Sequence, residues 1–499
     1  MLLGCQTIDQ RDTNLEKSEP AVMNLQGTTS GKSLRRSYIY AKIIDLFIGS
    51  LLQKSIRSAL IKFILKRRAI IEKLKSGVVY DALKRSTYQN PYENWNELRD
   101  KDPIHWSDIS QAWVLSRHSD VDAILRDHKR FSNGNPSEQR AVKKNEEKTL
   151  TEIIFGNPGY HRFSNSKTDK PGLEEAEPDA PSMLASDPPD HTRLRALVAH
   201  AFTPKAITLW ESKVQSVAKT LIEDIGDTSE FDFLERYAIP FPLTVIAEMI
   251  GVPVKDRIQF KSWTAKLART LEPGLTTKEI KDATQAGSEL AKYFNVIIEQ
   301  RRTAPENDLI SLLVKAEDEG DKLSNAEVHA SLRLLLVAGH ETTANLLGNG
   351  MYALLKNPDQ MSWLRNNLDQ MNLAVEEMLR YDTPVASNGR VALTDVEIGG
   401  KLIKKGDFII LLHGAANHDT DMWETPDSLR LDNLNGRDHL SLGRGIHYCL
   451  GAPLARLEGE IGFEKVLTQW STIELTEAPR YNTNAVFRGL TSLKVRVSS

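Results

Sequence analysis

The sequence predicts a mainly α-helical fold, and three stretches lead to this prediction. Residues 324–356 form a long, largely apolar run, residues 205–330 show helical periodicity over most of their length, and residues 450–467 place apolar side chains three or four positions apart. Strand-like runs such as 104–106 and 112–115 are short. We therefore expect helices to form most of the core, with few strands.

Length and composition narrow the class of protein. The chain has 499 residues, 40% of them hydrophobic, which is enough to bury a large core in one domain with an N-terminal extension. The formal net charge of −3 gives no indication of nucleic-acid binding. Two cysteines, Cys5 and Cys449, indicate no disulfide framework, so a reducing, cytoplasmic location is expected. No apolar run is long enough for a membrane-spanning helix.

The first 76 residues differ in composition from the rest. Residues 1–36 are polar and are expected to form a disordered leader. Residues 37–76 place apolar side chains at helical intervals, and residues 31–75 carry twelve Lys or Arg against two acids. This pattern predicts a basic amphipathic helical extension that can lie peripherally on an anionic membrane surface, at the inner face of the membrane. A helix that packs against the catalytic domain would explain this pattern equally well. The acidic residues that precede it argue against an organelle-targeting segment.

The catalytic domain is expected over residues 91–499. After Pro91 the pattern indicates a short helix, the two short strands and a helix at 119–127. Residues 131–183 are rich in Gly, Pro, Asn and Ser with little periodicity, and a loop of this length inside a domain is usually functional. Between the later helices the clearest break lies near residues 271–277, where Pro273 and Gly274 interrupt the periodicity.

A helix beginning near Asp190 places His191 and Arg195 four residues apart. Side chains at this spacing lie on the same face of a helix, one turn apart. Two donors that can carry positive charge could together bind paired carboxylates. An ordinary solvated helix face would explain a histidine and an arginine equally well.

The long helix at 324–356 contains two residues that are poor helix formers within one turn. Gly339 and Thr342 flank His340 and Glu341, and such local departures often mark a site. A glycine here lets the helix open locally, and an acid beside an alcohol offers a path for protons. A buried helix with a small residue at a close helix crossing, and with threonine hydroxyls bonded to the preceding turn, is the structural alternative.

A second helix, near residues 373–381, carries Glu377 and Arg380. The two side chains are three residues apart and face each other, so an ion pair is expected. Most pairs of this kind lie on the surface and contribute little to stability.

The loop before the helix at 450–467 carries the cysteine that is best suited to bind a metal. Gly443 and Gly445 allow positive φ angles in a tight loop, and Gly451 lets a flat group approach the backbone. Cys449 lies at the N-terminus of the helix, where unpaired N–H groups and the helix dipole are expected to lower the pKa of a thiol. Such a loop suits a planar macrocycle. A buried structural cysteine is the alternative.

These stretches together resemble the cytochrome P450 family. His439-Leu-Ser-Leu-Gly-Arg-Gly-Ile-His-Tyr-Cys449-Leu-Gly resembles the family's haem-binding loop, with Leu442 where a phenylalanine is usual. Ala338-Gly-His-Glu-Thr-Thr343 and Glu377-x-x-Arg380 match two further family motifs, in the same order along the chain. The resemblance implies a triangular helical domain with a small β-rich subdomain that binds haem b, with Cys449 as the iron ligand.

The resemblance also implies roles for other residues. Thr342 would position dioxygen and water, Glu341 would relay protons beside Gly339, and Glu377 with Arg380 would anchor the segment leading to the cysteine loop. A third member of that anchor is replaced by Asn433, for which Arg430 or Arg437 would have to compensate. The residues implied to contact haem are His191, Arg195, Arg390, His439, Gly443, Gly445 and Gly451. Those implied to line the substrate pocket are Leu335, Ala338, Val385, Ala386, Ser387 and Phe487.

The implied reaction is that of a monooxygenase. It would hydroxylate or epoxidise an apolar small molecule with O₂ and two electrons. Because no flavin or iron–sulfur domain fits in this length, a ferredoxin or flavodoxin with an NAD(P)H-dependent reductase would supply the electrons. Arg444 and Arg456, near the cysteine loop, could help an acidic carrier dock. A peroxygenase that uses H₂O₂ and a non-catalytic haem protein are the alternatives. Fatty acids, terpenoids, steroids and polyketides all remain open as substrates.

Overall fold

A computed structural model describes residues 52–82, 84–134, 180–318, 323–432 and 436–498. The chain divides into two units, Met1–Ser58 and Ala59–Ser499. The expected leader at 1–36, the first part of the extension at 37–76 and most of the loop at 131–183 lie outside the described residues. In the first unit the description covers only residues 52–58, which begin helix α2 (Leu52–Ser76).

The last part of α2 is anchored in the larger unit through a buried carboxylate. Glu72 is 1% exposed and accepts hydrogen bonds from the backbone N–H groups of Tyr80 and Ile109, at 2.7 and 3.1 Å, and its carboxylate lies 2.8 Å from the His105 ring. The compact unit therefore begins before Pro91, where the sequence suggests that the catalytic domain starts.

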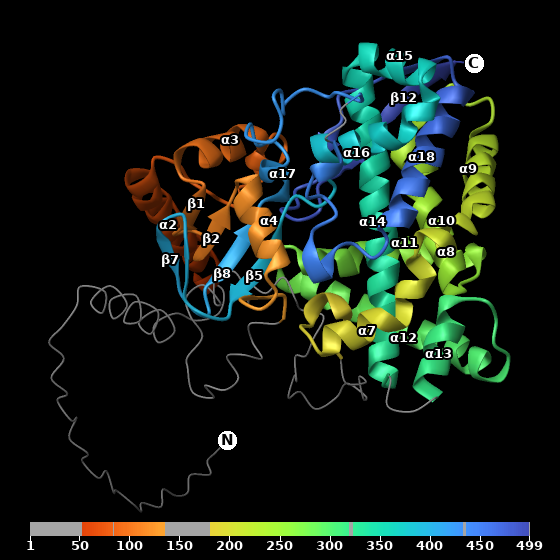
Figure 1. The fold of residues 1–499 in the computed structure, drawn as a ribbon, viewed down its shortest axis with the longest axis horizontal. Coiled ribbons are helices and arrows are strands. Elements are labelled where there is room, and N and C mark those ends of the chain that lie inside the picture. Colours follow the sequence, from red (N-terminus) through yellow and green to blue (C-terminus); the bar gives the residue numbers. More distant parts are fainter. Residues whose placement is uncertain (1–51, 83, 135–179, 319–322, 433–435, 499) are drawn as a thin grey trace, which may run out of the picture. The chain divides into compact units, whose positions relative to one another are not determined.

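The largest sheet is built from strands far apart in the sequence. Its order is β1–β2–β8–β5–β3, with β2 and β8 parallel and the other neighbours antiparallel. In Figure 1 it lies beside α3 (Tyr92–Lys101) and α4 (His118–Arg126). Its strands are β1 (Ile104–Ser107), β2 (Ala112–Leu115), β3 (Phe131–Ser132), β5 (Asn388–Ala392) and β8 (Phe408–Leu411).

The other strands that the structure describes form three smaller sheets. They have the orders β4–β12–β9, β6–β7 and β10–β11. Their strands are β4 (Glu230–Asp232), β6 (Val396–Ile398), β7 (Lys401–Ile403), β9 (Thr472–Leu475), β10 (Arg480–Tyr481), β11 (Leu490–Ser492) and β12 (Lys494–Ser498).

Helices form most of the larger unit, as the sequence predicts. Single-turn helices such as η6 (Arg269–Leu271) and η9 (Gly445–His447) connect some of them. The α-helices that follow α4 are α7 (Asp190–Ala199), α8 (Pro204–Thr208), α9 (Glu211–Ile225), α10 (Pro240–Ile250), α11 (Arg257–Ala268), α12 (Thr277–Thr303), α13 (Leu309–Asp318), α14 (Asn325–Lys356), α15 (Pro358–Asn366), α16 (Met371–Tyr381), α17 (His413–Ala416) and α18 (Ala452–Gln469).

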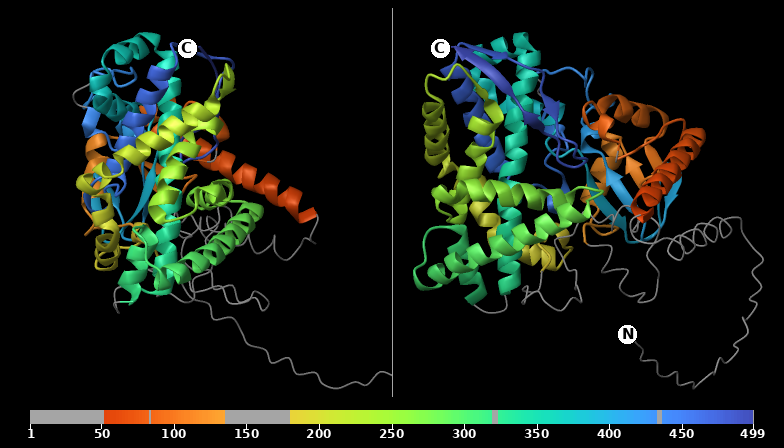
Figure 2. Two further views of the ribbon diagram at one scale, coloured as in Figure 1. Left: turned by 90° about the vertical axis from the view of Figure 1, so that its right-hand side faces the viewer. Right: turned by 180° about the vertical axis from the view of Figure 1, so that it is seen from behind.

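Helix α14 runs through the middle of the helical core. A capping box fixes its start, in which Ser324 accepts from the Glu327 N–H and the Glu327 side chain accepts from the Ser324 N–H. It packs on α10, α16 and α18, and α11 and α12 run crosswise to it (Figure 2). A Cβ on Gly350 would lie 2.6 Å from Phe463 of α18, so the small residue permits this close helix contact. The predicted helix at 324–356 is thereby confirmed.

Helix α16 is tied to the segment that precedes the cysteine loop. The Arg380 guanidinium donates to both oxygens of Glu377, at 2.7 Å each, and both side chains are almost fully buried. Arg380 also donates to the carbonyl oxygens of Asn417, Pro426 and Ser428. The pair is therefore an internal brace and not a surface salt bridge.

None of the helices among the described residues combines the length and apolar character needed to cross a membrane.

Candidate functional site

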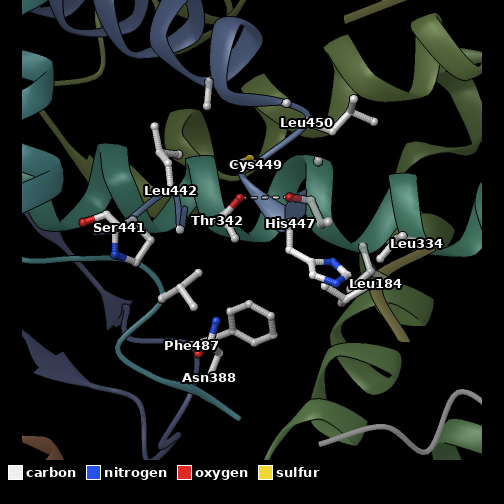
Figure 3. Close-up of a pocket in the computed structure, with 18 of the residues that line it drawn as sticks. Leu184, Leu334, Thr342, Asn388, Ser441, Leu442, His447, Cys449, Leu450 and Phe487 are labelled. Carbon is white, nitrogen blue, oxygen red and sulfur yellow. Dashed lines mark hydrogen bonds between the residues drawn. The ribbon is translucent and has the colours of Figure 1, made fainter. Parts of the chain in front are cut away.

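A cavity of about 310 Å³ opens between α14, α7, the cysteine loop and the start of β5. Apolar side chains form most of its wall, and a smaller number of cations, amides and one acid interrupt them. Figure 3 shows Cys449 and Thr342 coming to this space from different elements, the loop before α18 and α14. The cavity thus brings together two stretches more than 100 residues apart that the sequence singles out separately.

The cysteine loop has the backbone geometry that its glycines predict. Gly443 and Gly445 have φ of +68° and +67°, where other residues are strained. A Cβ on Gly445 would also come within 2.5 Å of the Leu125 carbonyl oxygen, so this glycine packs the loop against α4 and does not itself line the cavity. The Cys449 N–H donates to the Leu442 oxygen at 2.8 Å and closes the loop.

The wall beside the sulfur leaves room for a flat group. Gly451 lines the cavity, and a Cβ built on it would meet no atom within 4 Å. A side chain there would project into the open space next to Cys449. The expectation that Gly451 permits a close approach to the backbone agrees with this geometry.

The pKa of the Cys449 thiol is raised, contrary to the sequence prediction. Burial is the largest cause, and it outweighs the N–H groups of Gly451 and Ala452 and the positive charges of Arg195 and Arg456, which lower the pKa. The helix N-terminus therefore acts in the predicted direction but is too weak to offset desolvation. A bound metal ion would supply the missing positive charge and deprotonate the thiol.

Three cationic or basic side chains face the cavity and form no ion pair with any acid in the part of the chain that the structure describes. Arg390 is buried and donates to Asn133 Oδ1 and to the Gly389 oxygen, each at 2.7 Å. Burial lowers the pKa of Arg390 to about 10, against the attraction of Asp187. Arg195 donates to the Tyr448 oxygen at 2.7 Å, and burial lowers its pKa too. Neither arginine has a carboxylate within ion-pair distance among the described residues.

His191 completes this group. It is 3% exposed, and neither ring nitrogen has a hydrogen-bond partner among the described residues. Burial and then the charge of Arg195 lower the pKa of the imidazole. Its ring contacts His447, with 4.2 Å between centroids. Buried donors without acceptors are costly, so this wall is suited to an anionic group with several oxygen atoms.

His439 does not belong to the cavity, which corrects the expectation that it contacts haem. Its Nε2 lies 3.1 Å from Glu376 Oε2, and its Nδ1 accepts from the Ser441 N–H at 3.1 Å. Both ring nitrogens are thus engaged behind the loop. Burial alone would raise the pKa of Glu376, but hydrogen bonds from His439 and Arg456 bring it to about 2.

Helix α14 presents four of the predicted residues to the cavity: Leu335, Ala338, Gly339 and Thr342. The helix stays unbroken at Gly339, so the expected local opening is absent. A Cβ on Gly339 would lie 2.7 Å from Ile246, and the close crossing with α10 therefore requires the glycine. The Thr342 hydroxyl donates to the Ala338 oxygen at 2.9 Å (Figure 3).

Glu341 points away from the cavity wall. Its side chain is 31% exposed, and Oε2 lies 3.4 Å from Nε2 of His340. His340 in turn lies 3.2 Å from the Thr264 hydroxyl of α11. Glu341 therefore lies between solvent and the turn of α14 that carries Thr342.

Glu458 of α18 is the one acid among the described residues that line the cavity, and the sequence analysis does not single it out. Neither carboxyl oxygen has a hydrogen-bond partner of standard geometry among the described residues. Burial raises the pKa of Glu458 to about 8, against a smaller opposing interaction with Thr343. The group is therefore held neutral and can donate a proton in a hydrogen bond, which an ionised carboxylate cannot.

Other polar groups on the wall also escaped the sequence analysis. His413 of α17 has both nitrogens unpartnered among the described residues, and burial, then Arg390, lowers its pKa to about 3. Asn388 and His447 line the same space. The position of His447 two residues before Cys449 offered a signal, whereas His413 and Asn388 stand in no recognisable pattern.

The remaining predicted pocket residues lie at the far side of the cavity from α18. Val385, Ser387 and Phe487 line it, whereas Ala386 is buried behind the wall and donates its N–H to the Val486 oxygen. Val385 and Phe487 pair as an isolated antiparallel bridge. Two chain segments about 100 residues apart thus form one wall.

The side chains of Arg430 and Arg437 do not join the Glu377–Arg380 pair, although the sequence suggested that one of them would compensate for Asn433. Arg430 donates its backbone N–H to Glu377 at 2.9 Å, while its guanidinium donates to Asp432. Arg437 is exposed, and Asn433 lies outside the described residues. Arg444 pairs with Asp122 at 3.4 Å and Arg456 pairs with the buried Glu376, so the charges expected to attract an electron carrier are largely matched within the protein.

The donor set suits a haem group better than a metal ion held by protein side chains alone. The described residues contain no group of three or more His, Cys, Asp or Glu side chains that could hold a metal ion. They offer one thiol, an open glycine beside it, and unpaired cations that match carboxylates. An iron held by one thiolate within a planar, dianionic macrocycle meets all three features.

Comparison with known proteins points to one family. The family profile described as Cytochrome P450 matches residues 159–491. The polyketide biosynthesis cytochrome P450 PksS of Bacillus subtilis is 36% identical over 421 residues, which cover 82% of this chain and 96% of the relative. Cytochrome P450 CYP107DY1 of Priestia megaterium is 36% identical over 390 residues, which cover 78% and 90%.

Solved structures agree with the sequence comparison. The crystal structure of CYP109E1 from Bacillus megaterium in complex with testosterone has a TM-score of 0.69 and 29% sequence identity, over 83% of this chain and 99% of that one.

The raised pKa of Glu458 predicts a pH dependence of stability. An ordinary glutamate has a pKa of 4.5, so between about pH 4.5 and pH 8 the carboxyl ionises in the unfolded chain but not in the folded protein. The free energy of unfolding therefore falls as pH rises through this window, by at most about 1.4 kcal/mol per pH unit.

Chemical denaturation of wild type and Glu458→Gln at about pH 5 and about pH 8 measures this effect. The variant, which has no proton to lose, is expected to show a smaller loss, while Glu474→Gln at an exposed position should behave as wild type. Equal pH slopes for wild type and Glu458→Gln would show that the carboxyl is already ionised in the folded state.

Proposed function

Since the chain belongs to the cytochrome P450 family, we propose that its cavity holds haem b through Cys449 and that the enzyme hydroxylates or epoxidises an apolar small molecule. Members of this family bind haem b, and the chain is accordingly a haem-dependent monooxygenase that acts on small molecules. The observation that carries the residue assignment is that Cys449 and Thr342 line one cavity together with Arg195 and Arg390, which have no carboxylate partner among the residues that the structure describes.

In this proposal the residues of the cavity divide the task of holding the haem. The Cys449 thiolate binds the iron, and Arg390, Arg195 and His191 neutralise and hydrogen-bond the two propionates. Gly451 leaves room for the plane of the ring. When bound, the haem supplies the iron that activates dioxygen, so that one oxygen atom enters the substrate and the other leaves as water.

We propose that Thr342, which lines the cavity, and Glu341, which does not, together deliver protons to the site. Because the Thr342 hydroxyl donates to the Ala338 oxygen, its own oxygen is free to accept a hydrogen bond from water in the cavity. Formation of one water molecule consumes two protons. The partly exposed Glu341 carboxylate can take protons from solvent and pass them toward the neighbouring Thr342. Gly339 keeps α14 close to α10 and thereby fixes the position of this turn.

Electrons are proposed to come from a separate carrier. The chain has two cysteines, fewer than the four ligands of a common iron–sulfur cluster. A ferredoxin or flavodoxin with an NAD(P)H-dependent reductase is the proposed source. Since Arg444 and Arg456 are paired with Asp122 and Glu376, other groups near the cysteine loop would supply most of the attraction for an acidic carrier.

The walls favour an apolar substrate. Leu335, Val385 and Phe487 line the space with other aliphatic residues, and such a surface binds apolar molecules by excluding water. One structural relative was solved with testosterone and one sequence relative is named for polyketide biosynthesis. Steroids, polyketides and fatty acids are the classes to screen first.

Substitution of Thr342 tests the proposed proton management. In Thr342→Ala the cavity loses the hydroxyl that orients water, so product formed per NAD(P)H consumed should fall about tenfold or more, with hydrogen peroxide accumulating instead. The assay combines the haem-loaded protein, a ferredoxin with its reductase, and the steroid or fatty acid that gives the largest spectral change in a screen.

Thr342→Ser, which keeps the hydroxyl, serves as the matched control and should remain coupled. Full coupling in Thr342→Ala would remove the role assigned to this residue. Product formed from hydrogen peroxide alone at the same rate would favour a peroxygenase, and no NAD(P)H consumption with any carrier would favour a non-catalytic haem protein.

We further propose that α2 contacts an anionic membrane, so that a cytoplasmic enzyme lies at the inner face of the membrane. Phe63, Ile70 and Leu74 are 65%, 52% and 82% exposed, and at 100° per residue they lie within about 40° of one another on the helix. Glu72, on the opposite face, is buried in the protein. The helix therefore packs on one side and leaves an apolar stripe uncovered among the described residues.

Basic residues flank this stripe. Lys66 and Arg67 are exposed and lie on either side of it, and Lys62 is exposed nearby. The described residues form no ion pair with any of the three. Apolar side chains between unpaired cations are the pattern of a helix that rests on anionic lipid headgroups.

Co-sedimentation with liposomes tests this contact. Wild type should bind vesicles of phosphatidylglycerol and phosphatidylcholine, and Phe63→Ser/Ile70→Ser/Leu74→Ser should bind at least about tenfold more weakly because burial of apolar area is lost. The control Leu209→Ser/Ile258→Ser/Leu402→Ser removes exposed apolar residues elsewhere and should bind as wild type. Equal binding by both triple variants would contradict the proposed surface.

A further inference from the structure

The connection between α11 and α12 contains a buried glutamate. Glu272 follows the single-turn helix η6, precedes Pro273 and Gly274, and is 5% exposed. Gly274 has φ of +71°, which allows the chain to turn sharply before α12 begins. A carboxylate buried in a turn needs donors, and in this protein all three donors come from one distant segment.

Those donors are three successive backbone N–H groups near the C-terminus. Glu272 Oε2 accepts from Ala485 at 2.6 Å and from Val486 at 2.9 Å, and Oε1 accepts from Phe487 at 2.9 Å. The three residues are 5 to 8% exposed, so no solvent is at hand to replace the carboxylate. The carboxylate thus fills a nest of amides, an arrangement that favours an anion.

Both sides of this contact belong to the wall of the cavity. Leu271, beside Glu272, lines it, and so do Val486 and Phe487. Hydrogen bonds from the Ala386 N–H to the Val486 oxygen and from the Ser387 hydroxyl to the Ala485 oxygen extend the connection to the start of β5. Glu272 therefore joins the α11–α12 connection to the two segments that form the opposite part of the wall.

A second contact between the α11–α12 connection and the C-terminal segment lies beside the first but is more exposed to solvent. Arg269 donates to Asn484 and also to Glu279, whose carboxylate forms the capping box at the start of α12. Arg269 and Glu279 have side chains about one third exposed, so solvent competes for these bonds. The Glu272 contact is the more deeply buried of the two.

We propose that the Glu272 carboxylate is a latch that holds the α11–α12 connection closed against residues 485–487 and so controls the exchange of bulky ligands with the cavity. The proposal rests on the proposed function in taking this cavity as the haem and substrate site. Glu272 is a positioning residue, since it reaches the cavity only through Leu271, Val486 and Phe487.

The chemistry of the contact explains why it would act as a latch. The three bonds share one carboxylate and one rigid backbone segment, so they form and break together. Burial raises the pKa of Glu272, and the three N–H groups together with Arg269 partly offset that rise. When the connection moves away, the carboxylate gains water and the amides lose their acceptor, which gives closed and open states without a stable intermediate.

Replacement of Glu272 by glutamine removes the charge of the side chain but keeps its size. In Glu272→Gln the amide has one acceptor oxygen, and its NH₂ group faces N–H donors, so at least one of the three bonds is lost while the volume stays the same. Glu272→Asp keeps the charge on a shorter side chain and provides a second, milder variant. Glu72→Gln is the matched control, because Glu72 is also a buried acceptor of backbone N–H groups but does not line the cavity.

Stopped-flow absorbance of the haem-loaded full chain with two azoles measures the exchange. For clotrimazole, a bulky azole, we expect both association and dissociation rates in Glu272→Gln to rise about fivefold or more, with a smaller rise in Glu272→Asp. Imidazole is small, and its rates should change less than about twofold. Clotrimazole rates equal to wild type, or an equal rise for both azoles, would overturn the latch.

Hydrogen exchange provides a readout that does not depend on ligand binding. Amides of residues 269–280 should exchange faster in Glu272→Gln than in wild type, and the same peptides should be unchanged in Glu72→Gln. If neither azole perturbs the haem spectrum of wild type, the site assignment fails, while the exchange data still decide whether Glu272 closes the connection. Unchanged exchange at 269–280 would refute the latch alone.

Discussion

A buried thiol and buried cations share one cavity, and within the described ranges no carboxylate forms an ion pair with those cations. Burial raises the pKa of Cys449, Arg390 has no carboxylate within ion-pair distance among the described residues, and His191 has two unpartnered nitrogens. The one acid on the described wall, Glu458, is held neutral. A planar iron complex with two carboxylates would bind the thiolate through its iron and the cations through its carboxylates, so the charges of the cavity wall match those of haem.

Contacts in the surrounding fold hold these groups in place. The buried Arg380 binds Glu377 and three carbonyl oxygens of the segment at 417–428, which leads to the cysteine loop. Glu376, the residue before Glu377, binds the side chains of His439 and Arg456 behind the same loop. Adjacent glutamates of one helix therefore anchor the segment before the loop and the loop itself. On the opposite wall, Gly339 lets α14 pack against α10, which fixes Thr342.

Local patterns were enough to predict features whose cause is local. Helix α14 forms over the long apolar run, Gly443 and Gly445 have the positive φ that a tight loop needs, and the spacing of Glu377 and Arg380 puts the two side chains within reach of each other. Features that depend on packing were not predictable. His439 turned to Glu376, Glu458 and His413 reached the cavity from positions that no sequence pattern marks, and desolvation reversed the pKa shift expected for Cys449. Side-chain direction and burial are tertiary properties, and sequence spacing does not encode them.

The bond between the Cys449 sulfur and iron is the claim on which the other assignments depend. X-ray absorption at the iron edge of the haem-loaded protein measures it directly, because sulfur and nitrogen neighbours scatter differently. The account predicts one sulfur neighbour in wild type and none in Cys449→Ala. A wild-type iron surrounded by nitrogen and oxygen alone would contradict it.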